Sequence, residues 1–154
     1  MAVSTLYMES PIGILELQGD GEKLFSLRFA PEAQPSPVTA QPLLLEAKRQ
    51  LEEYFKGERD EFTLPLKIEG TVFQREVWKA LSEIPYGSTC SYGDVAKRIN
   101  RPKAVRAIGQ ANKANRFPII IPCHRVIGKN NSLTGYAGKQ VDKKEILLSL
   151  EYAK

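Results

Sequence analysis

Histidine and cysteine are scarce in this chain of 154 residues. His124 is the one histidine, and the two cysteines, Cys90 and Cys123, lie 33 positions apart without C-x-x-C spacing. Two such cysteines make no disulfide framework, and with a single histidine they cannot complete a four-ligand zinc site from soft ligands alone. We therefore expect no bound metal and no cofactor, and a free thiol that suits a reducing compartment.

Long apolar runs are missing as well. No stretch approaches the ~20 residues needed to span a bilayer, and residues 1–7 have neither the basic region nor the apolar region of a secretory signal. With 42% hydrophobic and 26% charged residues, the composition is that of a globular protein. These features predict a soluble, cytoplasmic protein that does not bind membranes.

Acidic residues are absent from one long stretch. No Asp or Glu occurs from Val95 to Val141, which contains ten Lys and Arg residues. Residues 1–70 carry seven basic and twelve acidic side chains, whereas residues 71–154 carry fifteen basic and six acidic ones. A run of charge is usually only a solvated face. A stretch of this length without acids instead favours a polyanionic partner, with nucleic acid as the leading candidate.

The first 69 residues predict a small α/β domain. Alternating apolar residues and turn signals indicate three strands, at about 4–9, 14–18 and 23–29, in an antiparallel sheet. A proline-rich connection follows at 31–42, and residues 43–56 have the apolar spacing of an amphipathic helix. Residues 62–68 form a short extended segment that leads out of this domain.

Residues 70–154 predict a second, mostly helical domain. Helices are expected at 71–84, with Thr71 as the cap, and at 95–99, 103–112 and 141–151. The two short central helices are joined by a tight turn and have the layout of a helix-turn-helix. The predicted fold class is thus α+β with two small domains, the second a winged helix-turn-helix domain that contains Cys123.

Cys123 is followed directly by His124 and Arg125, in the run Ile-Pro-Cys-His-Arg-Val at 121–126. A thiol becomes a strong nucleophile only when ionised, which requires a positive or proton-accepting neighbour. Neighbours on a strand point to opposite faces, so a water relay between Cys123 and His124 is easier than direct contact. The alternative is a cysteine that acts as a small buried apolar residue.

Several motifs together resemble one known family. Ile-Pro-Cys-His-Arg-Val is preceded by Arg106-Ala-Ile-Gly and by Asn115, and is followed by Thr134-Gly-Tyr-Ala-Gly. With the flanking segments at 73–78 and 144–148, these motifs resemble the bacterial O6-alkylguanine-DNA alkyltransferases over about residues 70–152. The resemblance implies DNA repair: an irreversible, stoichiometric transfer of the alkyl group from O6-alkylguanine, and from O4-alkylthymine, to Cys123. The partner would be double-stranded DNA and the protein a monomer.

The resemblance also implies catalytic roles. Cys123 would be the nucleophile, His124 would deprotonate it through a water, and Glu151 would orient the imidazole. Tyr92 would help to rotate the target phosphate and donate a proton as the guanine leaves. Considered alone, Tyr92 could equally be an aromatic residue that packs into the core at the start of a helix.

A DNA-binding set is implied in the same way. Arg106 would fill the base stack after the target base has left it, because a duplex base cannot present its O6 alkyl group to a thiol. The helix would lie in the minor groove, where small side chains permit close approach; this set comprises Ala104, Ala107, Ala111 and Lys113. The alanines could also be ordinary helix-packing residues.

The implied binding pocket for the extruded base lies around the cysteine. Asn115 would tie the helix-turn-helix to the active-site segment, although a turn asparagine is the simpler interpretation. The backbone carbonyls of Cys123 and Val126 would accept from the guanine amino group. The other residues expected to line the pocket are Pro118, Tyr136, Ala137 and Gly138.

Two alternatives remain at this level. Alkyltransferase-like proteins keep the fold and mark lesions without repairing them, but they lack the nucleophilic cysteine that this chain has at position 123. A Cys-His thiol enzyme that acts on small molecules would turn over repeatedly and would not need DNA. That second alternative leaves the acid-free basic stretch without an explanation.

Overall fold

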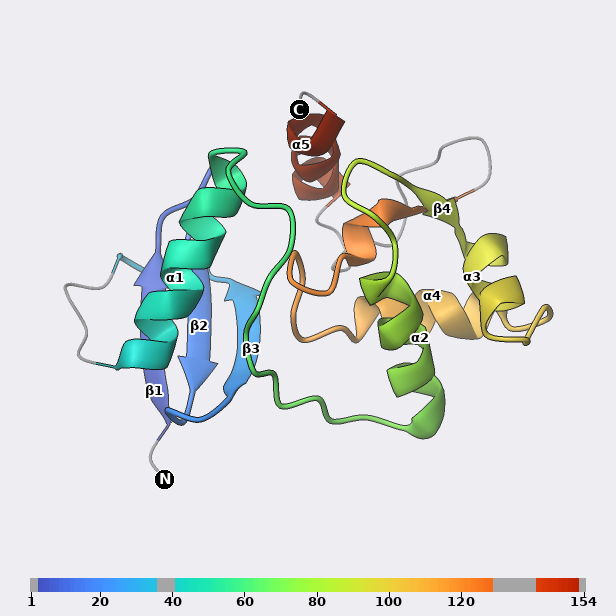
Figure 1. Ribbon diagram of the computed structural model, residues 1–154, viewed down its shortest axis with the longest axis horizontal. Helices are drawn as coiled ribbons and strands as arrows, with labels where there is room; N and C mark the ends of the chain where they lie inside the picture. Colours follow the sequence, from blue (N-terminus) through green and yellow to red (C-terminus); the bar gives the residue numbers. More distant parts are fainter. Residues whose placement is uncertain (1–2, 36–40, 129–140, 153–154) are drawn as a thin grey trace. The chain divides into compact units, whose positions relative to one another are not determined.

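The chain divides into two compact units, Met1–Ile68 and Glu69–Lys154, each described here by itself. The computed structural model describes residues 3–35, 41–128 and 141–152, with the side chains of 141 and 142 left out of the description (Figure 1). No helix in this described part of the chain is long and apolar enough to cross a membrane.

The first unit is an antiparallel sheet covered by one helix, as the sequence predicts. Its strands have the order β1-β2-β3, and their bounds are β1 Ser4–Met8, β2 Leu15–Gly19 and β3 Leu24–Phe29. Leu17 in the central strand pairs with Leu6 on one side and with Leu27 on the other, and all three are buried. This apolar row forms the sheet side of the core.

Helix α1, Pro42–Phe55, supplies the other side of that core. The Gln41 side chain caps it by accepting from the backbone N–H of Leu44 at 2.8 Å, and a proline in the first turn costs no hydrogen bond there. The face toward the sheet carries residues with 0% exposure: Leu44, Ala47, Leu51 and Tyr54. The predicted helix at 43–56 is therefore confirmed to within one residue at each end.

The second unit is mostly helical. Its helices are α2 Val72–Ser82, α3 Tyr92–Arg98, α4 Val105–Lys113 and α5 Val141–Tyr152. A short parallel pair joins β4, Cys90–Ser91, to β5, Val126–Ile127. Together with the sheet of the first unit, these elements confirm the predicted α+β class, with α3 and α4 as the helix-turn-helix.

Capping boxes fix where α2 and α3 begin. Thr71 and Gln74 exchange side-chain to backbone hydrogen bonds at 3.0 Å, and Ser91 and Asp94 do the same. The second box starts α3 at Tyr92, three residues before the predicted start. Between α2 and α4, the indole N–H of Trp78 donates to the Ala111 carbonyl at 2.8 Å inside the core, so the two helices are held together at this point.

Candidate active site

Cys123, His124 and Arg125 form a 3-10 turn and are all buried, with 2%, 0% and 6% exposure. The expectation of a strand through these residues is wrong: only Val126 and Ile127 pair, with β4. Pro118 and Pro122 have no N–H to donate to a sheet, and the N–H of Cys123 instead bonds the Ile121 carbonyl at 2.7 Å. Because the backbone turns here, the side chains of Cys123 and His124 do not alternate as they would on a strand.

The carboxylate of Glu151 collects four donors from distant parts of the chain. His124 Nε2 lies 2.6 Å from Oε2, and the Arg125 guanidinium donates to both oxygens, from Nε at 2.9 Å and from the second terminal nitrogen at 3.0 Å. The N–H of Gly87 adds a bond of 3.3 Å, from a turn with φ +81 that favours glycine. Glu151 thereby joins α5, the loop after α2 and the 3-10 turn Cys123–Arg125, called the cysteine turn below.

His124 is held in its neutral form. Burial is the main cause that lowers the pKa of the imidazole, and the nearby Glu151 carboxylate only partly opposes it. In a neutral ring facing a carboxylate, Nε2 carries the hydrogen and donates it, which leaves the lone pair on Nδ1. The arrangement therefore provides an imidazole that is ready to accept a proton.

The Cys123 thiol is protonated when the site is empty. Burial raises its pKa to about 11, although a hydrogen bond from the Asn115 side chain and the charge of Lys144 both act in the opposite direction. Asn115 also donates to the Ile121 carbonyl and accepts from the Phe117 N–H, each at 2.9 Å. A thiol in this state needs a proton acceptor before it can attack.

Lys144 is a residue of the site that sequence reasoning missed. It has 0% exposure, donates from Nζ to the Val126 carbonyl, and burial lowers its pKa to about 8. The signal was present, because Lys144, Leu147, Leu148 and Glu151 recur at the spacing of one helix face. This spacing predicts that Lys144 is buried on the same face of the helix as Glu151.

The other predicted active-site residues have varied positions. Tyr92 is the first residue of α3 and half-buried, and Pro118 is buried in the segment before the cysteine. Tyr136, Ala137 and Gly138 lie outside the described residues. The structure thus brings Cys123 together with His124, Glu151 and Asn115, and leaves the far wall of the expected pocket untested.

Helix α4 offers a narrower exposed face than the sequence predicts. Arg106, Ala107 and Lys113 are exposed, and Ala104 is half-exposed at the helix N-cap. Ala111 has only 2% exposure and packs in the core. Ala111 is therefore removed from the residues that we expect to face DNA, and the packing interpretation holds for it.

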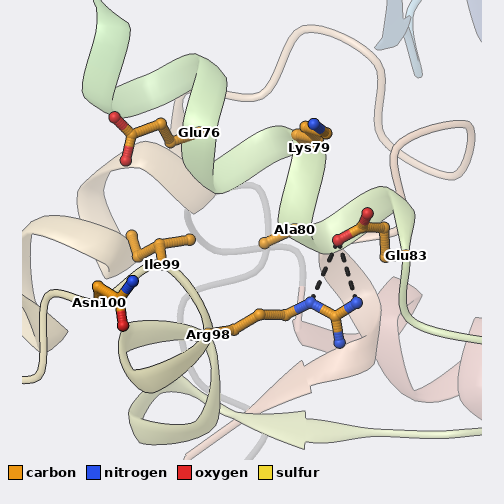
Figure 2. A pocket seen from close by; sticks show the side chains of 7 residues that line it. All are labelled: Glu76, Lys79, Ala80, Glu83, Arg98, Ile99 and Asn100. Carbon is orange, nitrogen blue, oxygen red and sulfur yellow. Dashed lines mark hydrogen bonds and ion pairs between the residues drawn. The ribbon is translucent and has the colours of Figure 1, made fainter.

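A hollow of about 290 Å³ opens between α2 and the end of α3. Figure 2 shows that Arg98 reaches across it to Glu83, at 3.1 Å. Its lining consists of Glu76, Lys79, Ala80, Glu83, Arg98, Ile99 and Asn100. These residues include neither a cysteine nor a histidine, and their charges neutralise one another, so this hollow does not extend the thiol site. In the described part of the chain, no group of three or more His, Cys, Asp or Glu residues is placed to hold a metal ion.

Together, the fold and the site define a helix-turn-helix protein with a buried thiol, next in sequence to a histidine whose imidazole contacts a buried carboxylate. Two family profiles match the chain: the 6-O-methylguanine DNA methyltransferase ribonuclease-like domain over residues 3–68 and the DNA binding domain of the same family over 72–153. The chain belongs to this 6-O-methylguanine DNA methyltransferase family, as its motifs predict.

Individual relatives agree with the family profiles over nearly the whole chain. The constitutive methylated-DNA–protein-cysteine methyltransferase of Bacillus subtilis is 48% identical, over 93% of this chain and 92% of its own length. The methylated-DNA–protein-cysteine methyltransferase of Methanosarcina acetivorans is 52% identical, over 93% and 94%. The crystal structure of Mycobacterium tuberculosis OGT in complex with DNA superposes with a TM-score of 0.85 at 45% identity, covering 96% of this chain and 91% of that one.

Proposed function

We propose that this protein repairs DNA by moving the alkyl group from O6 of a guanine onto Cys123, once per molecule. The observation that carries the proposal is the buried contact between Glu151 and His124, the residue that directly follows Cys123, in a chain of the methyltransferase family. O4-alkylthymine is the second substrate that we assign to it. The bond between the alkyl carbon and the base oxygen breaks as the bond between that carbon and Cys123 Sγ forms.

The proton of the thiol has a defined destination in this proposal. It passes, through a water, to Nδ1 of His124, whose Nε2–H already faces Glu151 at 2.6 Å. The carboxylate stabilises the imidazolium that forms, and Arg125 holds the carboxylate in place through two hydrogen bonds. Tyr92 supplies a proton to the guanine as it leaves.

One turnover per molecule follows from the product. The reaction ends in a thioether, which has no easy leaving group, so the alkyl group stays on sulfur. Each molecule then repairs one lesion. The protein is a reactant in this scheme as much as a catalyst.

We propose that double-stranded DNA, which contains the alkylated base, binds to the exposed face of α4. Arg106 is exposed there and would take the place of the extruded base in the stack, which recovers part of the few kcal/mol that unstacking costs. Ala107 and Ala104 permit approach to the minor groove, and Lys113 contacts phosphate. We expect the protein to act as a monomer in the cytoplasm.

The binding pocket for the base would be assembled around the cysteine turn. Pro118 and Val126 line it from the described side, together with Asn115, which holds the turn in place. Tyr136, Ala137 and Gly138 would close the other side.

The test is the intact mass of the protein after incubation with a duplex that contains O6-methylguanine. Transfer adds one methyl in place of one hydrogen, and peptide mapping should place it on Cys123. Cys123→Ser should gain no mass while it still binds the duplex, because a hydroxyl is not ionised near neutral pH. Cys90→Ser is the matched control and should gain the same mass as the unaltered protein. Tight binding by the unaltered protein without any mass gain would refute transfer in favour of lesion marking.

A further inference from the structure

Asn112 is a buried amide beside the nucleophile. It lies in the last turn of α4, the helix that also carries Arg106, and only 1% of it is exposed. Its Nδ2 donates to the backbone carbonyl of Cys123 at 3.5 Å. Its Oδ1 is buried and accepts no hydrogen bond from any of the residues that the structure describes.

The orientation of this amide follows from its one partner. A carbonyl oxygen can only accept, so the nitrogen end of Asn112 faces Cys123 and the oxygen end is fixed on the other side of the same group. A buried acceptor without a donor destabilises the folded chain. Such a group in a native structure needs an explanation, and a ligand that donates to it is one.

The base of an O6-alkylguanine can satisfy this acceptor in just one way. Alkylation at O6 removes the hydrogen from N1, and N3 and N7 have only lone pairs. The exocyclic 2-amino group is then the single N–H donor that the base has left. An acceptor that meets the extruded base beside Cys123 therefore meets either the 2-amino group or no donor at all.

The backbone carbonyls that we expected to receive this amino group each already accept at least one hydrogen bond, and a carbonyl oxygen can accept two. The Cys123 carbonyl accepts from the Val126 N–H and from Asn112, and the Val126 carbonyl accepts from Lys144. The side-chain oxygen of Asn112 has no competing donor among the described residues. Cys123 itself has only 2% exposure, and Asn112 is hydrogen-bonded to its backbone carbonyl, so this amide lies beside the residue that the extruded base must reach.

From these contacts we infer that Asn112 is a specificity-determining residue, whose Oδ1 accepts a hydrogen bond from the 2-amino group of the extruded guanine. The inference rests on the proposed function. It also gives a reason for selectivity between lesions, because O4-alkylthymine has no N–H on its ring. Asn112 favours the guanine lesion over the thymine lesion.

The experiment compares two duplexes that differ by one amino group. Single-turnover transfer is measured from O6-methylguanine and from O6-methylhypoxanthine, which lacks the 2-amino group, in the same sequence. The unaltered protein should react roughly fivefold to tenfold faster with the guanine duplex, the factor expected for one neutral hydrogen bond. Asn112→Leu, which is similar in size, should bring this ratio close to one.

The ratio cancels effects that act on both duplexes alike. A shift of Cys123 or a loss of DNA affinity slows both reactions and leaves the ratio unchanged. Gln110→Leu is the matched control, because it removes an exposed amide from the same helix, and it should keep the ratio of the unaltered protein. Should Asn112→Leu fail to fold, the substrate arm still decides, because equal rates of the unaltered protein on both duplexes overturn the inference. An unchanged ratio in a folded Asn112→Leu overturns it as well, whereas no transfer from either duplex would refute the proposed function instead.

Discussion

Removing the carboxylate of Glu151 should destabilise the second unit more than removing the whole ion pair. In Glu151→Leu, the Arg125 guanidinium loses two hydrogen bonds to a carboxylate whose side chain has 0% exposure. The guanidinium stays buried, with the Ile84 carbonyl at 2.8 Å and the Tyr86 ring at 5.5 Å as its remaining partners. Neither of them neutralises its charge.

The expected magnitudes follow from that geometry. Breaking a buried pair from one side costs about 3–5 kcal/mol, because an uncompensated charge remains inside. In the double variant Glu151→Leu with Arg125→Met no charge remains. Relative to Glu151→Leu, it adds only the unpaired Ile84 carbonyl, about 1–3 kcal/mol, because His124 and Gly87 lose the carboxylate in both variants. The double variant should therefore be more stable than Glu151→Leu alone, although it has lost more native contacts.

Urea unfolding followed by tryptophan fluorescence is the suitable assay. Trp78 is the one tryptophan of the chain and is buried in the second unit, so its emission reports this unit alone. Glu145→Leu, an exposed acid on the same helix, is the control and should change the free energy of unfolding by less than about 0.5 kcal/mol. A double variant less stable than Glu151→Leu would show that the carboxylate does not compensate the arginine, and the reasoning about this network would fail.

Three further predictions concern DNA and the charge of the site. Arg106→Ala should slow single-turnover repair in duplex DNA but hardly change the rate with free O6-benzylguanine, which has no stack to leave; equal losses on both would exclude Arg106 from the stack. DNA affinity, measured by fluorescence anisotropy, should fall by roughly one power of salt concentration per phosphate contact, and an affinity independent of salt would exclude the basic stretch from the interface. Burial lowers the pKa of Lys144 to about 8 from its ordinary value of 10.5, so above pH 8 the unfolded chain binds more protons at this residue and the free energy of unfolding should rise. The rise should level off near pH 9, because unfolded Cys123 has an ordinary pKa of 9.0 and loses its proton there while the folded thiol keeps it. Urea unfolding of Lys144→Met should show no such rise, and an identical rise would assign it to another group.

The parts of the fold that the sequence predicts correctly depend on interactions between residues close together in the chain. The capping residues Thr71 and Ser91, the apolar spacing of residues 43–56 and the turn signals of the sheet each act within a few positions. Helix starts and strand positions were therefore predicted to within a few residues. The apolar spacing predicts a later start for α3, at Val95, because the residues of its capping box, Ser91 to Asp94, are not apolar helix-face residues.

The cysteine turn could not be predicted in this way. Its apolar, β-branched sequence favours a strand, but Ile119 has φ +77, a conformation that costs a β-branched residue about 1–3 kcal/mol. Contacts from distant parts of the chain hold the segment in this shape. Arg125 donates to the Glu151 carboxylate of α5 and to the Ile84 carbonyl after α2. A local pattern cannot report such constraints.

The members of the candidate site were predictable only where a family motif names them. The family resemblance supplied His124 and Glu151, which lie 27 positions apart and meet at 2.6 Å. Lys144 and Asn112 escaped because lysine and asparagine are mostly exposed residues, and their burial depends on tertiary packing.

The burial of Cys123 also affects how long an unreacted molecule of the protein stays active. A molecule that reacts once is lost to every peroxide, disulfide or stray electrophile that finds its sulfur, and such losses follow thiolate character and access. With a pKa of about 11 and 2% exposure, Cys123 presents almost no thiolate to them. The features that make this sulfur unreactive in the free protein would thus preserve the pool of unspent molecules until a lesion arrives.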